Sequence, residues 1–144
     1  LKTTASCLCG GVTFTIQGAL RHIINCYCKQ CRKTHGLMGP YTQSCWTSIT
    51  FHNKKDLKWY ISSNKASRGF CKRCGSSIFW RPKAIKNQKL LVSISAGVLD
   101  NSTNLKLQGH IYTDYAPDFY TLPDDGLPHF TGSSCGKLDN DLAR

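Results

Sequence analysis

The sequence contains no glutamate, and all eight of its acidic residues are aspartates. Because glutamate is favoured in long solvent-exposed helices, its absence predicts a protein with little helix. The sequence also lacks a run of about 20 apolar residues, which a membrane-spanning helix needs. Its first residues lack the basic-then-apolar layout of a secretory signal. We therefore expect a soluble cytoplasmic protein, with the nucleus as the alternative location for a eukaryotic source.

Acidic residues are especially scarce in the first half of the chain. Residues 1–73 contain twelve Lys or Arg and one acid, Asp56, whereas residues 74–144 contain seven of each kind. The formal net charge is +11. A basic surface favours an anionic partner, either a small acid or a nucleic acid. The alternative interpretation is a positive surface that only keeps the protein soluble.

Short segments of β-forming residues dominate the rest of the pattern. Val12, Phe14 and Ile16 alternate with threonines and predict a half-buried strand. Similar segments predict strands at 21–25, 41–46, 49–51, 57–61, 76–80, 90–95 and 107–112. The only helical turns we expect lie at 29–35 and 98–101. At 144 residues, the chain is long enough for a hydrophobic core. The sequence thus predicts one mostly β domain over residues 1–130, followed by a polar tail over residues 131–144.

Four of the nine cysteines form two closely spaced pairs. Cys71 and Cys74 have the Cys-x-x-Cys spacing that lets two thiolates bind one tetrahedral zinc ion, and Gly75 allows the turn that follows. Cys7 and Cys9 lie two apart, so on an extended segment they face the same side. Together the four thiolates predict a closed, structural zinc site. A thioredoxin-like redox pair is the alternative, but it leaves Cys7 and Cys9 without a role.

A second group, Cys26, Cys28 and Cys31, places three thiols within six residues. Three ligands without an obvious fourth are typical of a metal site that keeps one position open for water or substrate. The group is therefore the candidate catalytic site. A fourth ligand would instead close the site and make it structural. Candidates for that ligand are His22, His35 and Cys45, or a residue distant in sequence.

Basic residues stand next to the cysteines, and positive charge favours the thiolate form of a thiol. Lys29, Arg32 and Lys33 are candidate contacts for an anionic substrate, by charge and proximity alone. A disulfide framework is disfavoured, because nine cysteines are an odd number and Cys-x-Cys is a poor disulfide spacing. His110, between Gly109 and Ile111, has no role that its position alone assigns.

These motifs resemble those of the glutathione-dependent formaldehyde-activating enzyme family, which includes centromere protein V-like members. The matching elements are Ser6-Cys7-x-Cys9-Gly10-Gly11-Val12, Cys26-x-Cys28-x-x-Cys31-Arg32-Lys33, Phe70-Cys71-x-x-Cys74-Gly75-Ser76, and Gly109-His110-Ile111 followed by Pro117-x-x-Tyr120. The resemblance covers roughly residues 5–130. It implies a β-tent fold of small coiled antiparallel sheets that agrees with the mostly β pattern.

The resemblance also implies two zinc ions per chain. One is a structural zinc on Cys7, Cys9, Cys71 and Cys74, and the other is a more labile zinc on Cys26, Cys28 and Cys31. The reaction implied is a carbon-sulfur lyase type, in which formaldehyde and glutathione are joined as S-hydroxymethylglutathione. Glutathione, or a related thiol, is then the small-molecule partner. The alternative hypothesis is a non-enzymatic zinc module that binds nucleic acid or a protein, and it is disfavoured because no known nucleic-acid-binding motif is present.

Overall fold

A computed structural model describes residues 1–138 of the chain, and these residues are mostly β-strand. The strands are β1 (Lys2–Ser6), β2 (Thr13–Gln17), β3 (Ile23–Cys26), β4 (Gly39–Cys45), β5 (Ile49–Asn53), β6 (Leu57–Ile61), β7 (Ala66–Cys71), β8 (Ser77–Pro82), β9 (Leu91–Ser95) and β10 (Leu107–Ile111). The described part has one α-helix, α1 (Lys29–His35), and the 3-10 turns Trp46–Ser48, Ala96–Val98 and Thr113–Tyr115. The expectation of a mostly β, helix-poor protein is confirmed. None of the described helices is long and apolar enough to span a membrane.

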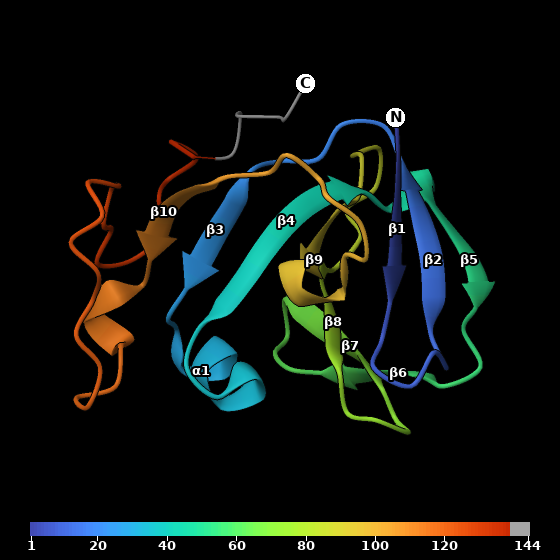
Figure 1. The fold of residues 1–144 in the computed structure, drawn as a ribbon, viewed down its shortest axis with the longest axis horizontal. Helices are drawn as coiled ribbons and strands as arrows, with labels where there is room; N and C mark the ends of the chain where they lie inside the picture. The colour runs from blue at the N-terminus through green and yellow to red at the C-terminus, as the bar shows by residue number, and fades with distance from the viewer. Residues whose placement is uncertain (139–144) are drawn as a thin grey trace.

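The strands form two sheets that stand side by side in Figure 1. A three-stranded sheet has the order β1-β2-β5, and a seven-stranded sheet has the order β10-β3-β4-β9-β8-β7-β6. The neighbouring strands are antiparallel except for β10 and β3, which run parallel. Here the structure differs from the expectation of antiparallel sheets. The long connection from β3 to β10 brings the chain back to the outer edge of β3, where it pairs in the same direction.

The hydrophobic core lies between the two sheets. Phe14 and Ile16 of β2 are buried, as their alternation with threonines predicts, and so are Phe79 of β8 and Ile94 of β9. The Phe14 and Phe79 rings are 5.0 Å apart. At the rim, the Arg81 guanidinium covers the Trp46 and Trp59 rings at 4.6 and 3.8 Å. Contacts of this kind between a cation and aromatic faces stabilise the rim of the core.

After β10 the chain forms an irregular segment, residues 112–138, which lies beside β10 in Figure 1. Its backbone pairs with that strand, because His110 donates to the Pro128 carbonyl and accepts from the Phe130 N–H, both at 2.9 Å. Part of the expected tail is packed as well, since Ser134 and Leu138 are buried. The division into a domain at 1–130 and a tail at 131–144 stays a prediction, and residues 139–144 lie outside the described part.

Candidate functional site

The first cysteine cluster joins two turns that lie more than sixty residues apart in the sequence. Cys7 and Cys9 follow β1, Cys71 ends β7, and Cys74 belongs to the turn between β7 and β8. All four sulfurs lie within 4.8 Å of one another. Cys7 Sγ is 3.8 Å from Cys9 Sγ, which is 3.6 Å from Cys71 Sγ. The pairs that the spacing singles out therefore meet at one point and could hold a metal ion.

Both turns have the same local construction. Gly10 follows Cys9 with φ +78°, and Gly75 follows Cys74 with φ +79°. This left-handed backbone turns N–H groups back toward the sulfurs, and glycine adopts it without steric cost. The N–H groups of Gly11 and Val12 donate to Cys9 Sγ and Cys7 Sγ at 3.4 and 3.2 Å. On the other turn the Cys74 N–H donates to Cys71 Sγ at 3.4 Å. Donors aimed at sulfur favour the thiolates that metal binding requires.

The second cluster forms where β3 passes into helix α1. Cys26 ends β3, Cys28 is the N-cap residue of α1, and Cys31 lies in its first turn. The Cys31 N–H donates to Cys28 Sγ at 3.4 Å. At its other end the helix stops at Gly36, which has φ +94° and donates its N–H to the Arg32 carbonyl. The predicted helical turn at 29–35 is thereby confirmed, and it places three sulfurs within 4.8 Å of one another.

Among the described residues, no fourth Cys, His or Asp side chain joins this second cluster. His22 instead accepts a hydrogen bond from the Lys106 N–H, and His35 is bonded to the Tyr41 hydroxyl. Hydrogen bonds from Cys26 and Cys31 lower the pKa of the Cys28 thiol to about 2, against the opposing effect of burial. The same contacts, with burial, raise the pKa of Cys26 well above its usual range. The contacts within the cluster thus favour a thiolate at Cys28.

A buried arginine lies against the second cluster. Arg68 of β7 donates from Nη2 to Cys31 Sγ at 3.5 Å and from Nη1 to the Tyr41 hydroxyl at 3.3 Å. Burial lowers the pKa of Arg68, but the charge of Cys31 and its hydrogen bond raise it more. The sequence shows several basic residues near the cysteines. Arg68 is one of the basic residues that charge alone offers as a substrate contact, but no spacing in the sequence places it against Cys31, 37 positions away.

Arg68 also orders the hydrogen bonds around Tyr41. A guanidinium can only donate, so the Tyr41 oxygen accepts from Arg68, and its proton points to His35 Nε2 at 2.6 Å. Burial, and then the charge of Arg68, lowers the pKa of His35 to about 4, so that Nε2 is free to accept at neutral pH. Burial raises the pKa of Tyr41, and the charge of Cys31 adds to this effect. Tyr41 and His35 can therefore share a proton at the edge of the second cluster.

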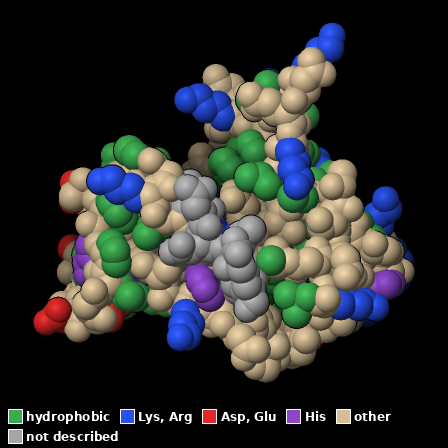
Figure 2. Space-filling view, turned by 90° about the horizontal axis from the view of Figure 1, so that it is seen from above, with side chains coloured by type: hydrophobic (Ala, Val, Ile, Leu, Met, Phe, Trp, Pro, Cys, Tyr) green, Lys and Arg blue, Asp and Glu red, His purple; other side chains and the backbone are tan. Residues whose placement is uncertain are grey.

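A cavity of about 550 Å³ opens beside the second cluster, with Cys26, Cys28 and Cys31 in its wall. This volume is in the range of pockets for small molecules. Of the three candidate contacts, Lys29 lines the cavity, whereas Arg32 and Lys33 do not. The remaining cationic residues of the wall are Arg21, Lys65 and Arg68, and apolar parts come from Ile24, Trp80 and Ile111. On the face in Figure 2, by contrast, Lys and Arg side chains stand apart from one another.

A third polar group contains His110, Asp125 and His129, whose ligand atoms also lie within 4.8 Å of one another. His110 is completely buried. Sequence reasoning left this group out, because Asp125 and His129 come from an irregular segment and have no spacing that points to His110.

Comparison with known proteins places these clusters in context. The family model described as glutathione-dependent formaldehyde-activating enzyme matches residues 2–115, which include every cysteine of both clusters. The chain belongs to this family. A protein of the fission yeast Schizosaccharomyces pombe, named an uncharacterized lyase, is 26% identical over 116 residues. That alignment covers 80% of this chain and 81% of the yeast protein.

Proposed function

We propose that this protein is a zinc-dependent carbon-sulfur lyase-type enzyme that interconverts formaldehyde and glutathione, or a related thiol, with their adduct. The observation that carries the proposal is that the three-cysteine cluster lies in the wall of a cationic cavity, next to a buried arginine. Membership of the formaldehyde-activating family and the likeness to a yeast protein named a lyase support the reaction class.

The donor sets of both clusters fit zinc. Thiolate sulfurs are preferred ligands of zinc, and a tetrahedral ion with Zn–S bonds of about 2.3 Å has sulfurs about 3.8 Å apart. The distances of 3.8 and 3.6 Å in the first cluster agree with that geometry. Its four thiolates would form a closed structural site. The three thiolates of Cys26, Cys28 and Cys31 would leave one position open.

In the reaction the thiol sulfur bonds to the formaldehyde carbon, and the thiol proton moves to the former carbonyl oxygen. A zinc ion on the second cluster would supply a Lewis acid. Arg68 holds positive charge beside Cys31, which favours the thiolate form of that sulfur. Tyr41 lies in the cavity wall, and its hydroxyl, bonded to His35, is the group that holds or passes on the proton. His35 is half-buried and links Tyr41 to the solvent side of α1.

The substrate class follows from the charge of the cavity. Glutathione carries two carboxylates, and Arg21, Lys29 and Lys65 provide cationic groups around the cavity. We expect Lys29→Gln to weaken glutathione binding several-fold, measured by calorimetry. Lys33→Gln is the matched control on the same helix, because Lys33 lies outside the cavity wall. Equal affinity of the Lys29→Gln variant and the unaltered protein would contradict this assignment of the anionic subsite.

The alternative of a non-enzymatic zinc module has less support. Nucleic-acid binding needs closely grouped cations that neutralise phosphates, and it weakens steeply as salt is added. The Lys and Arg side chains on the face in Figure 2 are separated by other residues. The cations of the cavity instead surround a space of small-molecule size.

A further inference from the structure

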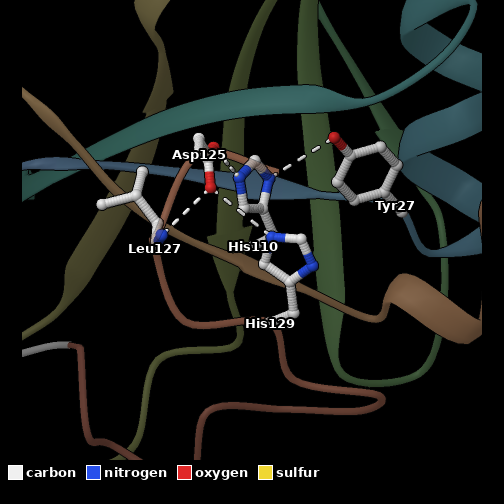
Figure 3. Close-up of polar contacts among 5 residues, drawn as sticks. All are labelled: Tyr27, His110, Asp125, Leu127 and His129. Carbon is white, nitrogen blue, oxygen red and sulfur yellow. Dashed lines mark hydrogen bonds and ion pairs between the residues drawn. The ribbon is translucent and has the colours of Figure 1, made fainter. Parts of the chain in front are cut away.

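The buried imidazole of His110 is bonded at both of its nitrogens. In Figure 3 it lies between Tyr27 and Asp125. Nδ1 is 3.4 Å from the Tyr27 hydroxyl, and Nε2 is 2.7 Å from Asp125 Oδ2. On the outer side, His129 Nε2 is 3.5 Å from Asp125 Oδ1, and the Leu127 N–H donates to that same oxygen at 3.0 Å.

The direction of these hydrogen bonds follows from the charge of Asp125. The hydrogen bond from His110 lowers the pKa of Asp125 to about 2, so the carboxylate only accepts. His110 therefore donates from Nε2, and in a neutral imidazole Nδ1 is then the acceptor. A tyrosine hydroxyl can donate as well as accept, so the Tyr27 hydroxyl is the donor to this Nδ1. Tyr27, His110 and Asp125 thus form a continuous chain of hydrogen bonds.

The distance between His110 and Asp125 is that of a hydrogen bond and is shorter than the ligand separation of a tetrahedral metal site. Ligands of an ion with bonds of 2.0 to 2.1 Å lie about 2.8 to 3.0 Å apart in octahedral geometry and about 3.3 to 3.4 Å apart in tetrahedral geometry. His110 Nε2 and Asp125 Oδ2 are closer than that, at 2.7 Å. This is the ordinary separation of a charge-assisted hydrogen bond.

One end of the chain belongs to the second cysteine cluster. Tyr27 stands between Cys26 and Cys28, is fully buried, and donates its N–H to the Ile111 carbonyl at 3.0 Å. Its hydroxyl adds a side-chain contact to β10, through His110, beside the backbone pairing of β3 with β10. The orientation of Tyr27 therefore constrains the backbone that carries Cys26 and Cys28.

The other end belongs to residues 116–130, which lie beyond the family match at residues 2–115. This segment is held against β10 at His110 by the two backbone hydrogen bonds to Pro128 and Phe130. Gly109 makes the close approach feasible, because a Cβ atom there would collide with the Leu138 side chain and crowd the Pro128 carbonyl. Asp125 is thus carried to His110 by a segment that is fixed in place.

We propose that Asp125 is a positioning residue, which acts through His110 and Tyr27 to hold Cys26 and Cys28 in the geometry that binds metal. Partners that orient ligand-bearing groups typically change metal affinity by 10- to 100-fold when they are removed. The inference rests on the proposed function in one respect, that the second cluster holds zinc. It adds that the segment after residue 115 determines how tightly that zinc is held.

The experiment measures the zinc affinity of the second cluster in the full chain, by competition with a chromophoric chelator. Asp125→Ala and Tyr27→Phe should weaken that affinity about tenfold and leave the zinc of the first cluster in place. Asp125→Asn keeps an oxygen that accepts from His110, so it should restore most of the affinity. His129→Gln is the matched control. His129 contacts the same carboxylate but is not part of the hydrogen-bonded series from Tyr27 through His110 to Asp125, so its loss should change the zinc affinity less than twofold.

Unchanged affinity in both Asp125→Ala and Tyr27→Phe would overturn the inference, as would an equal loss in His129→Gln. If Asp125→Ala does not fold, Tyr27→Phe decides the matter, because it removes only the hydroxyl. If the unaltered protein binds a single zinc ion, the proposed function fails, and exchange of the Tyr27 amide hydrogen then tests the positioning alone. Exchange at least tenfold faster in Tyr27→Phe supports the inference, and unchanged exchange contradicts it.

Discussion

The guanidinium of Arg68 lies 3.5 Å from the sulfur of Cys31 and also bonds to the Tyr41 hydroxyl. Arg68 stands on β7, three residues before Cys71, which belongs to the first cysteine cluster. One strand therefore serves both clusters. The first cluster fixes the end of β7, and this fixes the position of Arg68, the cation that contacts the second cluster. A metal ion at the first cluster would in this way influence the second cluster without sharing a ligand with it.

Arg68→Lys is expected to lower the catalysed rate by about 10- to 100-fold, because hydrogen bonds of charged groups contribute about 1.5 to 3 kcal/mol. Lysine keeps the charge but lacks the forked guanidinium that reaches Cys31 and Tyr41 together. The measurement is the rate of adduct formation at fixed zinc content. Arg73→Lys, at an exposed position beside the first cluster, is the control and should keep the full rate. A full rate in Arg68→Lys would show that the contact has no part in the reaction.

Cys28→Ser should lose the second metal ion and keep the fold. Cys28 caps α1 through its sulfur, but serine caps helices well, so the helix start is preserved. Metal content should fall from two ions per chain to one, with an unchanged circular dichroism spectrum. Cys135→Ser, at an exposed cysteine outside both clusters, should retain two ions. Two ions in Cys28→Ser would exclude the three-cysteine cluster as a metal site.

Cys71→Ser, unlike Cys28→Ser, should destabilise the fold. Cys71 is fully buried, and its cluster joins β1 to the turn after β7. Binding of structural zinc contributes directly to the free energy of folding, so loss of one ligand should unfold the N-terminal strands. Complete chelation of the unaltered protein should produce the same loss of β signal in circular dichroism. A native spectrum after complete chelation would contradict a structural role for the first cluster.

His35 should make the protein less stable in acid. The pKa of His35 is lowered in the fold from 6.5 to about 4, so the folded state favours the neutral ring. The stability this contributes is present above pH 6.5 and is lost as the pH falls toward 4. We expect the free energy of unfolding of the unaltered protein to fall by about 1 to 2 kcal/mol over this range, a value reduced for partial exposure of the ring. His35→Gln should not show this decrease. Denaturant unfolding of both proteins between pH 7 and pH 4 measures it. Parallel pH curves for the two proteins would refute the assignment.

The cysteine clusters could be predicted because their chemistry depends on local spacing. Cys-x-x-Cys followed by Gly75 and Cys-x-Cys followed by Gly10 specify turns whose sulfurs point the same way, and the structure assembles them. The helical turn at 29–35 was equally local. Two strands were missed for the opposite reason. β1 has two β-branched threonines but no large apolar side chain, and β7 contains Ser67, Arg68 and Gly69, so neither shows the apolar alternation that predicts a strand.

The polar contacts around the second cluster could not be predicted, because they depend on which strands become neighbours. Arg68 reaches Cys31 only because β7 and α1 pack together, and no spacing in the sequence joins them. The parallel pairing of β10 with β3 likewise brings His110 next to Tyr27. Asp125 then arrives from a loop-like segment. Contacts of this kind follow from tertiary structure and not from local pattern.

The most direct test of the account is the rate at which formaldehyde and glutathione exchange with their adduct at equilibrium, measured by NMR with and without the protein. Equilibrium exchange is needed because thiols add to formaldehyde unaided. The account predicts faster exchange with the two-zinc protein, an equal rate with Cys135→Ser, and no acceleration with Cys28→Ser. The absence of acceleration by a protein that holds both zinc ions would contradict the proposed reaction. Acceleration by Cys28→Ser equal to that of the unaltered protein would exclude the second cluster as its site.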